Sequence, residues 1–141
     1  MSVDRLRAVS RWLLATLFVA AGVNHFRDPA FYDPMIPSVL PAPRFWVLFT
    51  GAAEVLGGVG LLVPWLRRAA GCGLSVMLVG FLWVHVAMVV EPPVWDGRPL
   101  PRWAMVVRLV MQGPLIAWVW WAAARPSRPV RGAAPASPER K

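Results

Sequence analysis

Five polar side chains lie within or at the ends of long apolar stretches, and they are the residues of this sequence that could do chemistry: His25, Glu54, His85, Arg108 and Gln112. A charged group costs roughly 2.5 to 3.5 kcal/mol near the centre of a bilayer, so such groups mark packing or functional sites. A carboxylate in this setting can exchange a proton. Imidazole, guanidinium and amide groups can bond the oxygens of a bound ligand.

Four apolar stretches must position these groups, at about residues 9–26, 45–66, 69–90 and 103–124. About 20 helical residues cross a bilayer core of about 30 Å. Hydrophobic residues make up 57% of the chain, which is too apolar for a soluble protein of 141 residues. We therefore predict an all-α integral membrane protein, a four-helix bundle. A rise of about 1.5 Å per residue places all five polar groups in the same half of this bundle.

The basic residues predict the orientation of the bundle. Short cytoplasmic loops retain positive charge, and ten Lys and Arg residues fall on one side of the predicted spans: Arg5, Arg7, Arg11, Arg67, Arg68, Arg125, Arg128, Arg131, Arg140 and Lys141. Both termini are therefore expected in the cytoplasm, and the polar groups near the outer face. The formal charge of +8 does not indicate nucleic-acid binding, because the basic residues lie between and beyond the apolar stretches.

The predicted organisation is one membrane domain, residues 1–124, followed by a disordered basic cytoplasmic tail, residues 125–141. The tail combines Arg, Pro, Ala and Ser without periodicity. One alternative concerns the first span, because its basic start and short apolar run also resemble a secretory signal with cleavage after Ala21. Cleavage there would leave three spans and detach His25 from its helix.

Glu54 has two interpretations. It could form a structural ion pair with Arg108 that fixes helix register, or it could titrate and exchange protons with a ligand or redox partner. Gly51 and Gly58 flank it at helical spacing and would let a neighbouring helix come close, so Glu54 should face protein. The only cysteine, Cys72, excludes an internal disulfide and a cysteine-based metal site.

Metal cofactors are a weaker interpretation of the histidines. His25 and His85 on different helices could ligate a haem, and His85 with Met88 one turn later could hold copper(I). However, His25 lies close to the end of its stretch, and a His–Met pair at this spacing arises often by chance. We expect no metal site.

The predicted outer loop, residues 28–44, contains five prolines among apolar residues. It should be neither a regular helix nor a solvated linker, and it should fold onto the bundle. It could act as a lid over the polar groups or as a purely structural plug. Tyr32 in this loop is included among the candidate ligand-binding residues.

The chain resembles the DoxX-like family of small bacterial membrane proteins over roughly residues 13–121. The resemblance rests on the segment 21–26 (AGVNHF), the spacing of Tyr32 and the loop prolines, the glycine-flanked Glu54, and more weakly on residues of the second half: His85, Arg108 and Gln112. It implies a four-helix bundle in the bacterial plasma (inner) membrane. Some relatives are named as membrane subunits of a thiosulfate:quinone oxidoreductase, and others are linked to thiol and oxidative-stress complexes.

The expected function is a membrane subunit or accessory of a redox system, with an outer-half pocket for a quinone-like or lipid-like ligand. Glu54 would exchange a proton, and His25, His85, Arg108, Gln112 and Tyr32 would bind the ligand. The expected partners are the lipid bilayer and a soluble or membrane redox protein, and the chain could form a homo-oligomer. Whether it catalyses a reaction itself stays open. Alternatives are a structural or assembly subunit without a ligand and a small oligomeric transporter.

Overall fold

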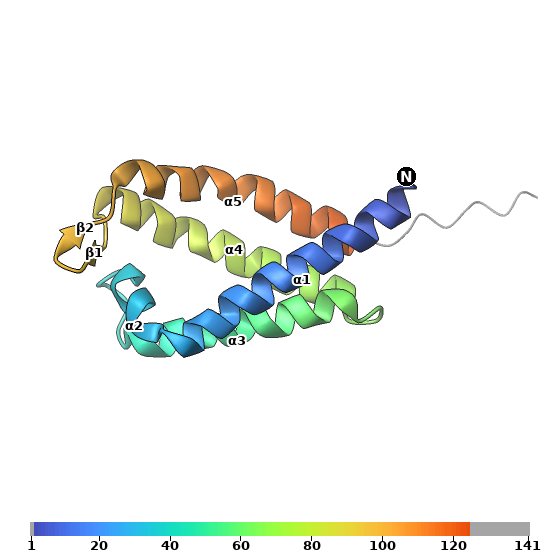
Figure 1. Cartoon of the computed structure of the whole chain (residues 1–141), viewed down its shortest axis with the longest axis horizontal. Coiled ribbons are helices and arrows are strands. Elements are labelled where there is room, and N and C mark those ends of the chain that lie inside the picture. Colours follow the sequence, from blue (N-terminus) through green and yellow to red (C-terminus); the bar gives the residue numbers. More distant parts are fainter. Residues whose placement is uncertain (1, 125–141) are drawn as a thin grey trace, which may run out of the picture.

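The computed structural model describes residues 2–124 and consists almost entirely of helices (Figure 1). Four helices are long and apolar enough to cross a membrane. They are α1 (Val3–Arg27), α3 (Pro43–Leu62), α4 (Arg67–Val90) and α5 (Arg102–Ala123). The predicted all-helical fold with four long apolar helices is confirmed. The predicted tail, residues 125–141, lies outside the described residues.

Local sequence explains where the helices differ from the predicted spans. α1 begins at Val3 rather than near residue 9, because the Ser2 side chain accepts a hydrogen bond from the Arg5 amide and caps the helix. α3 ends at Leu62, four residues before the predicted end at residue 66. Pro64 disfavours helical backbone at Val63, whose extended conformation ends the helix.

The bundle consists of two helix pairs, α1 with α3 and α4 with α5, and α3 also packs on α4. The start of α1 and the end of α5 lie at one end of the bundle, which we call the terminal end (Figure 1). There the side chain of Arg11 donates a hydrogen bond of 3.2 Å to the Ala122 carbonyl oxygen. The opposite end, the loop end, carries the connections between α1 and α3 and between α4 and α5.

Glycines allow close approach at the α1–α3 interface. A Cβ atom added to Gly51 would lie 2.6 Å from Cβ of His25 and 3.0 Å from the Gly22 carbonyl oxygen. One added to Gly58 would lie 3.1 Å from the Ala15 carbonyl oxygen. The close approach predicted from Gly51 and Gly58 is confirmed, and it places His25 directly against α3.

The loop predicted over residues 28–44 was expected to contain no regular helix, and this was wrong: residues 43 and 44 belong to α3, and the first half of the remaining segment, 28–42, is helical. It forms α2 (Pro29–Tyr32) and a 3-10 helix, η1 (Asp33–Met35). Pro29 and Pro34 occupy first-turn positions, where the missing amide proton costs nothing. The Asp28 carboxylate caps α2 by accepting a hydrogen bond from the Phe31 amide.

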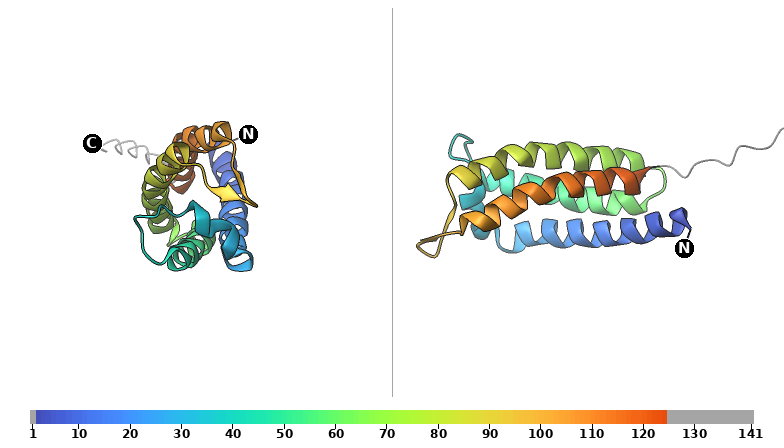
Figure 2. Two further views of the ribbon diagram at one scale, coloured as in Figure 1. Left: turned by 90° about the vertical axis from the view of Figure 1, so that its left-hand side faces the viewer. Right: turned by 90° about the horizontal axis from the view of Figure 1, so that it is seen from above.

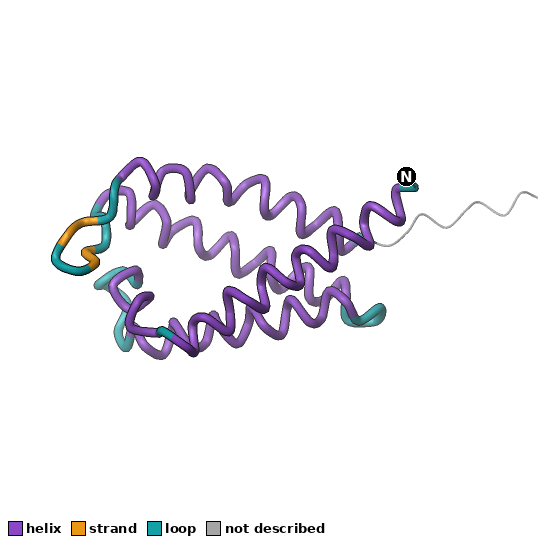
Figure 3. The backbone as a smooth tube through the Cα atoms, in the orientation of Figure 1, coloured by secondary structure: helices purple, strands orange, loops and turns teal. Residues whose placement is uncertain are grey.

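A short antiparallel hairpin, β1 (Val94–Trp95) with β2 (Arg98–Pro99), joins α4 to α5 (Figure 3). Its turn residues, Asp96 and Gly97, both have positive φ, which matches the twist of a two-residue hairpin turn. The Trp95 ring contacts the Phe31 ring edge-on, with centroids 4.7 Å apart. Seen from the loop end, the segment 28–42 and the hairpin lie across the end of the bundle (Figure 2).

Two buried clusters divide the bundle along its length. Eight apolar side chains form the core of the terminal half: Leu14, Phe18, Leu61, Leu74, Leu78, Val119, Ala122 and Ala123. Near the loop end, three methionines, Met35, Met88 and Met105, form a second and smaller cluster. Most of the buried polar side chains relevant to chemistry lie towards the loop end, beside the methionines.

Candidate functional site

A cavity of about 90 Å³ lies near the loop end, and all four long helices contribute to its wall. We call it the chamber. Its polar lining residues are His25 from α1, Tyr32 from α2, Thr50 and Glu54 from α3, His85 from α4 and Arg108 from α5. Its apolar lining residues are Met35, Ile36, Val47, Phe81, Val84 and Met88. The structure thus brings together five of the six candidate residues predicted from the sequence.

His25 and Glu54 form the central contact of the chamber. Nε2 of His25 lies 3.8 Å from Oε2 of Glu54, and their side chains are 11% and 9% exposed. The approach of α1 and α3 at Gly22 and Gly51 creates this contact, because larger residues there would separate the helices. Sequence analysis offered Arg108 as the ion-pair partner of Glu54. That pairing was wrong, since the described residues contain no such ion pair and His25 takes the position.

Backbone atoms fix the orientation of the His25 ring. Nδ1 of His25 lies 2.9 Å from the Val47 carbonyl oxygen, so Nδ1 carries the proton and donates it in a hydrogen bond. The Thr50 hydroxyl, 3.3 Å from Nδ1, also bonds the Trp46 and Val47 carbonyl oxygens. Nε2 therefore faces Glu54 as the nitrogen that can gain or lose a proton. One proton can be shared between the carboxylate and the imidazole.

Two buried polar atoms in the chamber wall have no hydrogen-bond partner: Oε2 of Glu54 and Nδ1 of His85. Glu54 and His85 are each only 7% exposed. Buried polar atoms are nearly always paired, because an unpaired one costs about 1–3 kcal/mol. The two atoms are therefore the natural contacts for hydrogen-bonding groups of a ligand in the chamber.

Arg108 supplies positive charge to several residues of the chamber rather than to one ion-pair partner. It is the one exposed residue of the lining, and its charge interacts with Glu54, His25 and His85. A guanidinium in this position can donate several hydrogen bonds to a ligand oxygen. It would also stabilise negative charge that develops on such a ligand.

Tyr32 closes the chamber from the loop end. Its ring lies 4.0 Å from the His25 ring, centroid to centroid, and its hydroxyl accepts a hydrogen bond of 2.8 Å from the Asn24 side chain. A bidentate ion pair between Arg44 and Asp33, with a shortest N–O distance of 2.6 Å, ties the segment to the start of α3. The segment therefore covers the chamber in a defined position.

Gln112 is the candidate residue that the structure does not bring to the chamber. Its side chain is buried, and Nε2 donates a hydrogen bond of 2.8 Å to the Leu78 carbonyl oxygen of α4. Its placement in the ligand site was wrong, because this bond links α5 to α4 nearer the terminal end. α5 continues as one helix through Pro114.

Sequence analysis missed several residues of the wall, of which Thr50 is the clearest. Thr50 lies four residues before Glu54 on the same face of α3, and this spacing could have identified it. Phe81 could have been found in the same way, four residues before His85. By contrast, nothing in the spacing indicated that Met35 would fold back onto Met88. Within residues 2–124, no group of three His, Cys, Asp or Glu side chains could hold a metal ion.

The fold and the site define a class: a bundle of four helices apolar enough to span a membrane, with a buried acid–imidazole pair near one end. The chain belongs to a family described as a domain of unknown function, DUF8561, whose model matches residues 14–123. This range includes every residue of the chamber. No curated protein and no solved structure shows a significant match.

Proposed function

We propose that this chain is a multi-pass protein of the bacterial plasma membrane, with both termini cytoplasmic, whose chamber binds the head of a quinone-like ligand. The main support for the proposal is that two buried atoms in the wall of one chamber, Glu54 Oε2 and His85 Nδ1, lack a hydrogen-bond partner. A quinone head presents oxygens to such groups, and the aromatic side chains Tyr32 and Phe81 offer flat surfaces to its ring. The sequence resemblance to DoxX-like proteins agrees with this proposal, but the proposal does not depend on it.

In this role the chain serves a redox partner rather than carrying electrons itself. Reduction of a quinone to a hydroquinone takes two electrons and two protons, and the partner protein supplies the electrons. The two protons come from water and pass one at a time through Glu54 to the ligand oxygens, and His25, reprotonated at Nε2 from water, returns a proton to Glu54 after each transfer. Arg108 and His85 hold the ligand oxygens. Oxidation of the hydroquinone runs the same steps in reverse.

The apolar core of the terminal half favours this proposal over a transporter. A transport path through one copy would need polar groups that continue towards the terminal end. Eight buried apolar side chains, among them Leu14, Leu61 and Val119, occupy most of that part of the bundle, where the buried polar side chains among the described residues are the two small serines Ser10 and Ser75.

The test is saturable binding of a short-chain quinone to the full-length protein in detergent, measured by native mass spectrometry and by quenching of tryptophan fluorescence. Glu54→Gln keeps the side-chain shape but removes the exchangeable proton, and we expect the dissociation constant to rise at least tenfold, about 1.4 kcal/mol. Asp96→Asn makes the same chemical change in the exposed hairpin and should bind like the wild type.

Two results would contradict the proposal. Wild-type protein that binds no quinone saturably would instead support a structural or assembly subunit. Unchanged quinone affinity in Glu54→Gln would show that Glu54 does not contribute to the site. Thermal unfolding of each variant shows whether it is still folded. A Glu54→Gln protein that is folded must still show the predicted loss of quinone affinity.

A further inference from the structure

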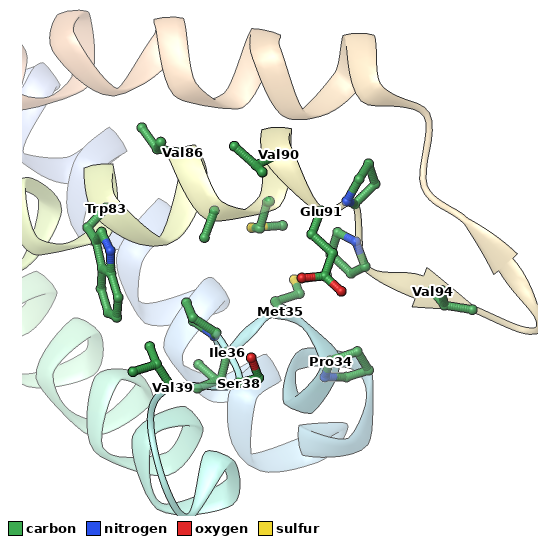
Figure 4. A pocket seen from close by; sticks show the side chains of 15 residues that line it. Pro34, Met35, Ile36, Ser38, Val39, Trp83, Val86, Val90, Glu91 and Val94 are labelled. Carbon is green, nitrogen blue, oxygen red and sulfur yellow. The ribbon is translucent and has the colours of Figure 1, made fainter.

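A second and larger cavity adjoins the chamber and has a different chemical character. It is a groove of about 500 Å³ between α4 and the segment 34–39, and it continues along residues 91–94 (Figure 4). In Figure 4, Trp83 projects from α4 towards Ile36 and Val39 on the opposite wall. Apart from Ser38 and Glu91, the side chains of the lining are apolar. The groove therefore suits hydrocarbon rather than a polar molecule.

Three residues belong to both cavities: Met35, Ile36 and Met88. They form a sill, the strip of side chains that separates the groove from the chamber. Met35 and Met88 are 7% and 3% exposed and belong to the same buried cluster. Methionine side chains are unbranched and adapt easily to a new neighbour, so this sill can rearrange without moving a helix.

The small volume of the chamber means that the sill affects whether a ligand ring can fit. About 90 Å³ holds only about three water molecules, whereas a cavity of about 150 Å³ accommodates a benzene ring. The chamber can therefore enclose a ring only if part of its wall moves. The sill is the part of that wall with further space behind it, because the groove begins on its other side.

We propose that the groove binds the single hydrocarbon tail of the ligand whose head occupies the chamber, with the tail passing over the Met35–Met88 sill. This inference rests on the proposed function. It specifies the ligand as a neutral amphiphile with one tail, such as a prenylated quinone. A phospholipid fits less well, because the charged residue of the groove is the carboxylate Glu91, which repels a phosphate.

The experiment compares two quinones that share one head, one without a tail and one with a ten-carbon tail. We expect the wild-type protein to bind the tailed quinone at least tenfold more tightly. Ala87→Trp places an indole in the groove but not in the chamber, since Ala87 lines only the groove. This variant should lose the preference for the tailed quinone while binding the tailless one as before.

Ala117→Trp is the matched control. It makes the same substitution at an exposed position of α5 that lines neither cavity. The tail also partitions into detergent, but it does so equally in both variants, so their difference reports the groove. Val39→Trp fills the groove from the opposite wall, where the residue is 70% exposed, and should reproduce the effect of Ala87→Trp.

The outcomes separate the two proposals. If the wild type binds both quinones equally, or if Ala87→Trp and Ala117→Trp retain the same preference, the groove is not the tail site, although the chamber can still bind a head. If neither quinone binds, the proposed function itself fails. Displacement of the tailed quinone by phosphatidylglycerol, with no effect of phosphatidylglycerol on the tailless one, would assign the groove to a phospholipid and overturn the inference.

Discussion

The chemical identity of the His25–Glu54 pair depends on an atom that belongs to neither residue. The Val47 carbonyl oxygen holds Nδ1 of His25 and leaves Nε2 to face the carboxylate. A backbone carbonyl oxygen cannot be removed by a side-chain substitution, so the orientation of the ring is robust to changes elsewhere in the chamber. The polar chemistry of the site thus rests on the packing of α1 against α3.

The hydrogen bond of Gln112 gives the first prediction at the scale of the residue. Gln112→Leu removes one buried hydrogen bond to a carbonyl oxygen and should destabilise the fold by about 1 kcal/mol, with quinone affinity unchanged within twofold. Gln112→Glu replaces the donor with an acceptor facing the Leu78 carbonyl oxygen, and should cost more. Unfolding in detergent and quinone binding measure the two effects. A tenfold loss of quinone affinity in folded Gln112→Leu would contradict this prediction and show that Gln112 belongs to the ligand site.

At the scale of the element, the contact between α1 and α3 determines whether the site exists. Gly22 and Gly51 face one another across this contact, and an added Cβ atom at either would meet backbone or β-carbon atoms of the other helix. Such atoms cannot rotate away as the end of a long side chain can. The helices would have to separate, and the His25–Glu54 distance would grow with them.

The corresponding prediction compares two glycines. Gly51→Ala should destabilise the bundle by about 1–3 kcal/mol, because the added methyl group overpacks the interface. Gly80→Ala adds the same methyl group where no neighbouring atom lies within 4 Å, and should not lower stability but raise it by up to about 1 kcal/mol, because alanine favours the helix over glycine. Thermal unfolding of both variants in one detergent checks this difference. Equal effects would show that α1 and α3 are not held in this contact.

The sequence predicted which segments form helices far better than it predicted the residues at which those helices begin and end. Three apolar stretches of full span length and one shorter stretch near the N-terminus predicted the four helices, since length and composition follow from the residues alone. The segment 28–42 was harder, because its prolines were judged as breakers although Pro29 and Pro34 stand where a helix tolerates them. The hairpin turn at Asp96 and Gly97 carries a recognisable local signal that the apolar pattern had obscured.

The candidate site was predictable as a set of residues but not as a set of contacts. The cost of burying polar groups identified four of the residues that line the chamber, and the composition of the loop added Tyr32. Helical spacing then grouped Gln112 with Arg108, although the rotation of α5 directs the Gln112 side chain towards the Leu78 carbonyl oxygen. It also left the partner of Glu54 open. Only the packing of α1 against α3 selects His25 over Arg108.

At the scale of the whole molecule, stability and chemistry occupy different ends of the bundle. The terminal half has the larger apolar core, whereas the loop half contains the chamber and the groove. Changes in the chamber wall can therefore alter binding while the core of the terminal half stays packed. The proposed orientation places the chamber near the outer face of the membrane.

Cysteine labelling tests that orientation. In a Cys72→Ser background, Ser38→Cys at the loop end should react with a membrane-impermeant maleimide in intact cells. Ser2→Cys at the terminal end should react only after the cells are permeabilised. Labelling of the Ser2→Cys protein in intact cells would contradict the proposed cytoplasmic position of the N-terminus. Both variants leave the chamber lining untouched.

Each helix pair consists of two long helices that follow one another in the sequence. This order has a consequence for synthesis of the chain. α1 and α3 are both made before α4 and α5, so a nascent chain whose last exposed residue is Leu62 already contains both members of the acid–imidazole pair. α4 and α5 then enter as a second hairpin and bring His85 and Arg108 to the chamber. The proposed ligand site is therefore complete only after α5 has been made.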